Sequence, residues 1–169
     1  MECPVNLEII TNIAFIRIAN PPVNALSLVV RQGVMKSLDT AKRDEAISAI
    51  VIAGDGNTFP AGADITEFGS PAESPHLPMI CDRIEYLNKP VICSMHGTAL
   101  GGGLEIALSC HYRLATPDAK LGLPEVHLGL LPGAGGTQRL PRLIGLPEAF
   151  KITASGIPIN AQKAKELGL

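Results

Sequence analysis

Hydrophobic and polar residues are arranged along the chain in patterns that predict strands and helices in turn. Residues 13–19 alternate between the two types, which is typical of a strand, and residues 46–54 form a continuous apolar run that predicts a buried strand. Between them, residues 26–44 carry apolar side chains at helical spacing. The chain therefore begins with a strand, a helix and a second strand. The residues that define the apolar face of this helix are Leu26, Val30, Val34 and Leu38.

The second half of the chain continues the alternation of strands and helices. Residues 58–78 are rich in Gly, Pro and Ser, which predicts either an ordered functional loop or a mobile flap. The other predicted elements are a helix at 79–88, a strand at 89–97, a loop entering a helix over 99–110, strands at 112–116 and 119–123, a helix over 133–145 interrupted near Pro141, and helices over 147–156 and 160–169, the last capped by Asn160. Strands that are apolar on both faces and alternate with helices predict an α/β layered fold in one domain, residues 1–169. The chain stops directly after a helical pattern, and we expect it to be a fragment of a longer protein.

Composition excludes several classes of protein. The net charge is −2 and Lys and Arg are scattered, so the basic surface of a nucleic-acid-binding protein is not expected. We expect no secretory signal and no spanning helix, because no uncharged apolar run reaches the roughly 18 residues that a span requires. The 4 cysteines form no CxxC pair, which favours free thiols in a reducing intracellular compartment over zinc sites or disulfides.

The stretch "ALGGGLEIALSC" (residues 99–110) places three consecutive glycines between a predicted strand and a predicted helix. Such glycines let another group approach the backbone and leave the first helical N–H groups free to bind an anion. The anion could be a phosphate, but the glycine spacing of dinucleotide-binding folds is absent. Those folds also place an acidic residue at the end of a second strand about 20 positions further on, whereas Asp118 lies at a turn. The alternative is a thioester or ester oxygen on which negative charge develops.

Two carboxylates lie in apolar surroundings. Glu105 falls in the first helical turn, where a glutamate on a solvated face would be unremarkable, but its neighbours offer no polar face for it to share. Glu125, after Pro124, is either an exposed loop or helix-start residue or the second member of an acid–base pair. A buried carboxylate tends to have a raised pKa, which suits proton transfer near neutral pH. The two residues together favour general acid and base roles.

Other candidates carry weaker signals. The segment "AGAD" (residues 61–64) is either an ordinary turn or a source of one more backbone N–H for an oxyanion. His96, His111 and His127 lack the spacing of a metal site, and no serine lies in a G-x-S-x-G turn, so we expect structural histidines and no metal site.

Taken together, four motifs in this order resemble the crotonase (enoyl-CoA hydratase/isomerase) superfamily. They are "NPPVNALS", "FPAGADI", "GTALGGGLEIALSCHYRLA" and "LGLPEVHLGLLPGAGGTQRLPRLIG". The resemblance covers nearly the whole chain and is strongest to the amino-terminal hydratase/isomerase part of the multifunctional β-oxidation enzymes of peroxisomes and bacteria. It implies a crotonase-like (ClpP/crotonase) spiral of ββα units, here without its carboxy-terminal helices and without any dehydrogenase domain that follows.

The resemblance also implies a role for each matching residue. The N–H groups of Ala63 and Gly102 would polarise the thioester oxygen of an acyl-CoA, and Glu105 and Glu125 would act as acid and base. Glu105 would orient and deprotonate the water that attacks C3, and Glu125 would exchange the proton at C2. The positions implied to contact substrate or CoA are Ala61, Asp64, Ile65 and Gly133.

The implied function is hydration of 2-trans-enoyl-CoA to 3-hydroxyacyl-CoA in fatty acid β-oxidation, with 3,2-enoyl-CoA isomerase as a side activity. No cofactor is expected for hydration because CoA is part of the substrate, and NAD would be needed only by a following dehydrogenase part. The partner is an acyl-CoA thioester, self-association is undetermined, and the compartment would be the peroxisome in a eukaryote or the cytoplasm in a bacterium. The alternatives are another reaction on the same oxyanion hole, such as thioester hydrolysis or decarboxylation, and an acyl-CoA-binding or assembly fragment without turnover.

Overall fold

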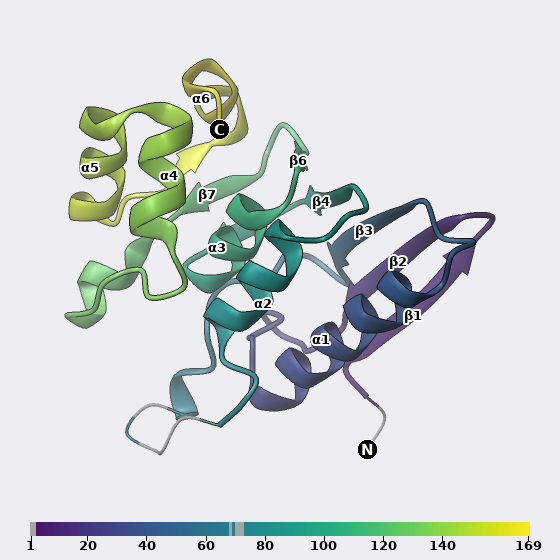
Figure 1. Ribbon diagram of the computed structural model, residues 1–169. Coiled ribbons are helices and arrows are strands. Elements are labelled where there is room, and N and C mark those ends of the chain that lie inside the picture. Colours follow the sequence, from purple (N-terminus) through teal and green to yellow (C-terminus); the bar gives the residue numbers. More distant parts are fainter. Residues whose placement is uncertain (1–2, 68, 70–72) are drawn as a thin grey trace.

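A computed structural model describes residues 3–67, 69 and 73–169, and it contains two sheets with helices packed around them (Figure 1). The larger sheet has the strand order β1-β2-β3-β4-β6, in which β1 is antiparallel to β2 and the other pairs are parallel. The smaller sheet has the order β5-β7-β8, with β5 parallel and β8 antiparallel to β7. The strands are β1 (Val5–Ile10), β2 (Ile13–Ile18), β3 (Ala49–Gly54), β4 (Val91–Met95), β5 (Thr98–Leu100), β6 (Tyr112–Ala115), β7 (Lys120–Gly122) and β8 (Ile159–Asn160).

The helices lie between and beside the sheets in an order that follows the chain. Helices α1, α2 and α3 run side by side across one face of the larger sheet, and α4, α5 and α6 lie at the end with the smaller sheet (Figure 1). The helices are α1 (Leu28–Arg43), α2 (Leu77–Glu85), α3 (Gly102–Ser109), α4 (Gly136–Ile144), α5 (Leu146–Ser155) and α6 (Ala161–Leu167), with short 3-10 helices η1 (Ile65–Glu67) and η2 (Pro124–Leu128).

The main core lies between the larger sheet and the helices on its covered face. Strands β2 and β3 bury every second residue, so that Ile16 and Ile52 point into the core, while α1 contributes the stripe of Val30, Val34 and Leu38. Helix α3 is buried at all 8 of its residues, as expected for an apolar helix surrounded by other elements. The site described below is therefore built on a helix that is fixed on all sides.

The structure confirms the predicted α/β architecture and corrects three details. Strand β1 was not predicted, because most of its residues are exposed and leave no buried alternation to detect. Residues 98–100, expected to be loop, form strand β5. The expected interruption near Pro141 is wrong: α4 continues through Pro141 to Ile144, and the Pro141 carbonyl accepts a hydrogen bond from Gly145 N–H. Pro141 lies inside α4 and cannot donate the helical hydrogen bond of its own position, but the turn that follows it remains intact.

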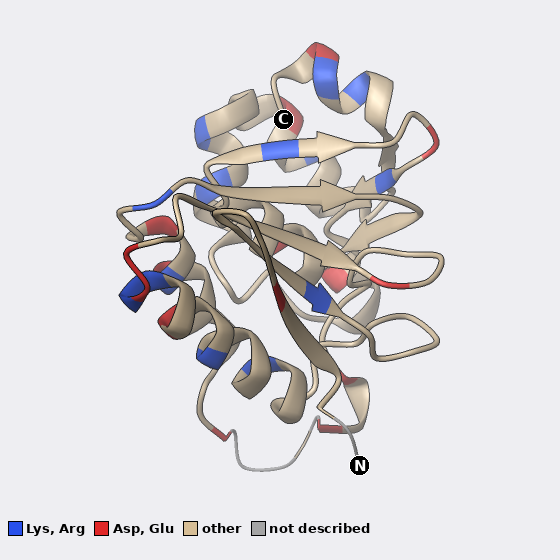
Figure 2. Ribbon diagram, turned by 90° about the vertical axis from the view of Figure 1, so that its right-hand side faces the viewer, with Lys and Arg blue, Asp and Glu red and all other residues tan. Residues whose placement is uncertain are grey.

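The distribution of charged residues, cysteines and histidines can be described on the structure. Basic and acidic residues are interspersed on the helices and loops (Figure 2). In the described ranges no helix combines the length and the apolar character needed to cross a membrane, and no cluster of three metal-ligating side chains occurs there. The cysteines are free, and each of the three histidines named above hydrogen-bonds to a backbone group.

Candidate active site

A cavity of about 380 Å³ opens beside the amino-terminal end of α3. Its walls come from the loop before η1, the start of α2, the glycine-rich start of α3, η2 and the segment before α4. Seven of the eight residues predicted from the sequence line this cavity: Ala61, Ala63, Ile65, Gly102, Glu105, Glu125 and Gly133. Segments far apart in the sequence thus meet at one place.

The three glycines at the start of the buried helix α3 each serve a different structural purpose. Gly101 has a φ of 51°, which disfavours other residues, and its N–H donates to the Gly122 carbonyl at 2.9 Å. A Cβ at Gly103 would lie 1.7 Å from the Pro60 carbonyl oxygen, and a Cβ at Gly102 would lie 2.5 Å from the Leu77 side chain. Only glycine allows the loop and α2 to approach the start of α3 so closely.

This close packing brings the two predicted oxyanion donors together. The loop is anchored by the hydrogen bond from Leu26 N–H to the Gly62 carbonyl at 3.0 Å, and a Cβ added at Gly102 would lie 3.7 Å from the Ala63 nitrogen. Within the described residues, neither the Ala63 N–H nor the Gly102 N–H donates to another backbone or side-chain group. Both groups are therefore free for an acceptor that enters the cavity.

Glu105 is a buried residue, only 3% exposed, although it lies in the first turn of a helix. One carboxylate oxygen, Oε1, accepts hydrogen bonds from Ala134 N–H at 2.7 Å and Gly136 N–H at 2.9 Å. Burial raises the pKa of Glu105, and these two N–H groups and the charge of Arg139 oppose that rise. The solvated first-turn alternative is thereby excluded, and Oε2 accepts no hydrogen bond from the described residues.

Glu125 faces the same cavity from η2 but lacks comparable partners. Its Oε2 is buried and has no hydrogen-bond partner among the described residues, and its Oε1 lies close to Gly101, 3.3 Å from where a Cβ would be. Burial, together with the nearby charge of Glu105, raises the pKa of Glu125 to about 7. Near neutral pH this carboxyl group can therefore both hold and release a proton.

The remaining predicted residues differ in how they meet the site. Ala61, Ile65 and Gly133 line the cavity, and the Ile65 side chain is 66% exposed at its mouth. Asp64 does not line it: its carboxylate accepts hydrogen bonds from the N–H and hydroxyl of Thr66 at 3.0 and 2.7 Å, which keeps its pKa low and starts η1. Asp64 thus shapes the turn that leads into η1.

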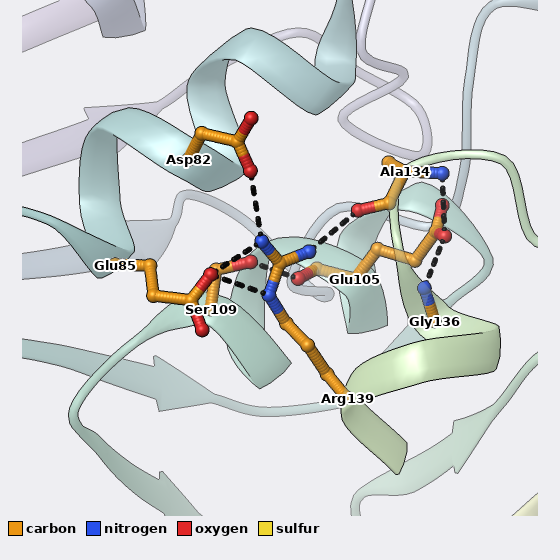
Figure 3. A network of polar contacts seen from close by, with 7 residues as sticks. All are labelled: Asp82, Glu85, Glu105, Ser109, Ala134, Gly136 and Arg139. Carbon is orange, nitrogen blue, oxygen red and sulfur yellow. Dashed lines mark hydrogen bonds and ion pairs between the residues drawn. The ribbon is translucent and has the colours of Figure 1, made fainter. Parts of the chain in front are cut away.

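Sequence analysis missed the residues that hold Glu105. Ala134, Gly136 and Arg139 form a hydrogen-bonded network around Glu105 together with Asp82 and Glu85 of α2 (Figure 3). The glycines of "PGAGG" were a signal of close backbone approach, although only Gly133 was singled out. Nothing in the local sequence distinguished Arg139 from an ordinary surface arginine.

Comparison with known proteins assigns the family. The family model described as enoyl-CoA hydratase/isomerase matches residues 8–169, nearly the entire chain. The chain belongs to the enoyl-CoA hydratase/isomerase family. This confirms the resemblance found in the sequence motifs.

Individual members of the enoyl-CoA hydratase/isomerase family agree with this assignment. The chain is 51% identical over 158 residues to the "Peroxisomal bifunctional enzyme" of Danio rerio, covering 94% of this chain and 22% of that protein. It is 44% identical to the "Probable enoyl-CoA hydratase" of Bacillus subtilis, covering 98% of this chain and 67% of that one. The solved enoyl-CoA hydratase from Bacillus anthracis superposes with a TM-score of 0.91 at 35% identity, over 98% of this chain and 67% of that one.

The structural match to the enoyl-CoA hydratase/isomerase family confirms the predicted crotonase fold. A second solved enoyl-CoA hydratase, from Mycobacterium tuberculosis H37Rv, superposes with a TM-score of 0.92 at 33% identity. The chain spans about a fifth of the length of the Danio rerio relative and about two thirds of the Bacillus subtilis relative.

Proposed function

We propose that the chain hydrates 2-trans-enoyl-CoA thioesters to 3-hydroxyacyl-CoA, as a hydratase of fatty acid β-oxidation. The observation that carries the proposal is that two carboxylates and two free backbone N–H groups line one cavity. The carboxylates differ in a way that suits the reaction: Glu105 is held by two N–H donors, while Glu125 has a pKa of about 7. Such a difference between paired carboxylates divides base and acid roles.

In the proposed reaction each group has one task. Glu105 accepts a proton from water as the water oxygen bonds to C3, and the C2–C3 double-bond electrons move onto the thioester oxygen. The N–H groups of Ala63 and Gly102 stabilise that negative charge; losing one such donor typically costs about 2.7–4 kcal/mol. Glu125 then donates its proton to C2, which completes the addition of water, and transfer of the proton from Glu105 to Glu125 restores the pair for the next turnover. The reaction consumes only water and the thioester.

The same geometry supports 3,2-enoyl-CoA isomerase as a side activity. Glu125 alone would remove a proton from C2 and return it to C4, with the same enolate bound by the two N–H groups. In this role the unpartnered Oε2 of Glu125 supports the proposal, because a proton carrier must be able to face the substrate carbon.

The positions of the other predicted residues suggest how each would contact the substrate. Ala61 and Gly133 would border the acyl thioester, Ile65 would pack against CoA at the cavity mouth, and Asp64 would act on CoA only through the turn that it holds. We propose that residues 1–169 belong to one crotonase-like domain that acts in the peroxisome of a eukaryote or the cytoplasm of a bacterium, and that NAD has no part in hydration.

Substitution of each glutamate tests the proposal. We expect E105Q and E125Q each to lower kcat for hydration of crotonyl-CoA by about 100-fold or more, because general acid–base catalysis contributes about 10²–10⁴-fold. Affinity for the CoA thioester, measured by calorimetry, should stay within a few-fold of wild type.

The alternatives give different results in the same experiment. Full hydratase activity in both variants would contradict the proposed roles. Binding of crotonyl-CoA by the unsubstituted chain without turnover would identify a binding module. Free CoA or a decarboxylated product in mass spectra would identify another reaction on the same N–H groups.

A further inference from the structure

Arg139 connects α2 to the segment that holds Glu105. Its side chain is only 11% exposed, and its guanidinium donates to Asp82 at 3.0 Å and to Glu85 at 2.6 and 3.1 Å. Through Nη1 it also donates to the Ala134 carbonyl at 2.8 Å (Figure 3). One fork-shaped cation therefore fixes two separate parts of the chain.

Ala134 lies between Arg139 and Glu105. Its carbonyl accepts from the guanidinium, and its own N–H donates to Glu105 Oε1 at 2.7 Å. The next residue, Gly135, has a φ of 98°, and a Cβ there would lie 2.2 Å from Nη1 of Arg139. The segment is thus folded around the guanidinium. The residue after Gly135 is Gly136, whose N–H is the second donor to Glu105 Oε1.

We propose that Arg139 is a positioning residue that holds residues 134–136 in place. The N–H groups of Ala134 and Gly136 can then both donate to Oε1 of Glu105, and Oε2 is left free for water. Arg139 does not line the substrate cavity, so it acts on the reaction through Ala134. The role of Glu105 toward water rests on the proposed function, but the hydrogen bonds that hold its carboxylate do not. A base displaced by about 1 Å can lose on the order of 100-fold in rate.

The charged and titratable groups that face Glu105 indicate what loss of Arg139 would do. They are Arg139 from α4, Cys81 from α2 and Glu125 from η2, and Arg139 is the one cation among them. Removing it takes away a charge that stabilises the carboxylate and loosens the two N–H donors that do the same. Both effects raise the pKa of Glu105, so a larger fraction would be protonated at neutral pH.

Four proteins test this role: wild type, R139Q, R139K and, as a matched control on the same helix, R142Q, whose side chain is exposed. We expect R139Q to lower kcat for crotonyl-CoA hydration by about 10- to 100-fold with KM within twofold, and to move the acid limb of the kcat/KM profile upward. R139K keeps the positive charge but lacks the planar guanidinium with its several donors, so we expect its kcat to lie between those of R139Q and wild type. R142Q should match wild type.

A second measurement does not depend on turnover. In protein labelled with ¹³C at the glutamate side-chain carboxyls, with E105Q identifying the signal, the pKa of Glu105 should be higher in R139Q than in wild type. Unchanged titration in a folded R139Q would overturn the positioning role even if hydration is confirmed. Conversely, a wild type without hydratase activity would overturn the proposed function while the titration still decides the role of Arg139.

R139K keeps the test decisive if R139Q fails to fold in thermal unfolding measurements. A single ammonium group cannot reach the Ala134 carbonyl and both α2 carboxylates with the geometry of a guanidinium. We therefore expect a raised Glu105 pKa and a lowered kcat in R139K as well. Wild-type values of both quantities in R139K would contradict the proposal.

Discussion

Glu105 and Glu125 show how two identical side chains acquire different chemistry from their surroundings. Both face one cavity, but two N–H groups donate to Glu105, whereas Glu125 has a buried oxygen without a partner among the described residues. Donated hydrogen bonds favour the ionised form of a carboxyl group, and burial without them favours the protonated form. The pair is therefore suited to carry one proton between its two members.

This shared proton predicts the pH dependence of hydration. Because the pKa of Glu125 is raised to about 7, the last proton leaves the pair as the pH rises through that value, and we expect kcat/KM to fall about tenfold per pH unit above it. The overall addition of water consumes no net proton, so kcat/KM for dehydration should follow the same profile. Initial rates in both directions across this range measure it. A flat alkaline profile would show that Glu125 does not supply the proton.

At the same scale, the sequence predicted which carboxylates line the cavity better than it predicted their hydrogen-bond partners. Glu105 and Glu125 stood out as carboxylates among apolar residues, and the cavity collects both. The donors to Glu105, in contrast, lie 29 and 31 positions further along the chain, so their contact is a product of tertiary packing. The environment of Asp64 was equally hidden, because a turn-forming carboxylate looks the same in sequence as a ligand-binding one.

Among the secondary-structure elements, α3 depends most on the absence of side chains at its start. We expect G103A to destabilise the fold by about 1–3 kcal/mol or more, because the added methyl group would meet the Pro60 backbone at 1.7 Å, a contact that no rotamer can relieve. Denaturant unfolding measures the change. G133A is the matched control, since a Cβ there has only the Leu131 carbonyl oxygen nearby, at 3.8 Å. Equal stability of the two variants would contradict this account of α3.

The elements that the sequence predicted well are those with one clearly buried face. In β2, β3 and α1 the buried positions recur at regular intervals, and apolar residues occupy those positions in the sequence, so the periodicity predicted the elements. Strands β1 and β8 escaped detection for different reasons: β1 is largely exposed, and β8 has only 2 residues. Strand β1 exists because it pairs with the neighbouring strand β2, and β8 exists because it pairs with β7, which is distant in the sequence.

At the scale of the whole molecule, an ion pair attaches the loop that carries Ala63, a proposed oxyanion donor, to the first helix. Arg31 is 8% exposed and donates to the Leu26 and Pro75 carbonyls and to Glu67, whose other oxygen accepts from Leu28 N–H at 2.6 Å. Glu67 at the end of η1 and Pro75 just before α2 are thereby tied to the beginning of α1. The position of Ala63 consequently depends on residues that lie outside the cavity.

Substitutions of Arg31 and Glu67 should distinguish the contribution of their charges from that of their hydrogen bonds. We expect R31M to cost about 1–3 kcal/mol of stability and to raise KM for crotonyl-CoA, because two carbonyls and Glu67 lose their donor. E67Q should cost less, since an amide oxygen can still accept from Leu28 N–H. Thermal unfolding and steady-state kinetics measure both effects. A larger loss in E67Q than in R31M would show that the ion pair itself is dominant.

Strand β7 lies between β5, which leads into the glycines of α3, and β8, which comes from near the end of the chain. Leu121 pairs with Ile159, and Ala161 N–H donates to the Ala119 carbonyl at 3.0 Å. During synthesis, every group proposed for catalysis leaves the ribosome before the residues that complete this sheet. A nascent chain arrested ahead of Ile159 would hold all the chemical parts proposed for the site while one edge of β7 stayed open, so the site gains its full support only once β8 has been synthesised.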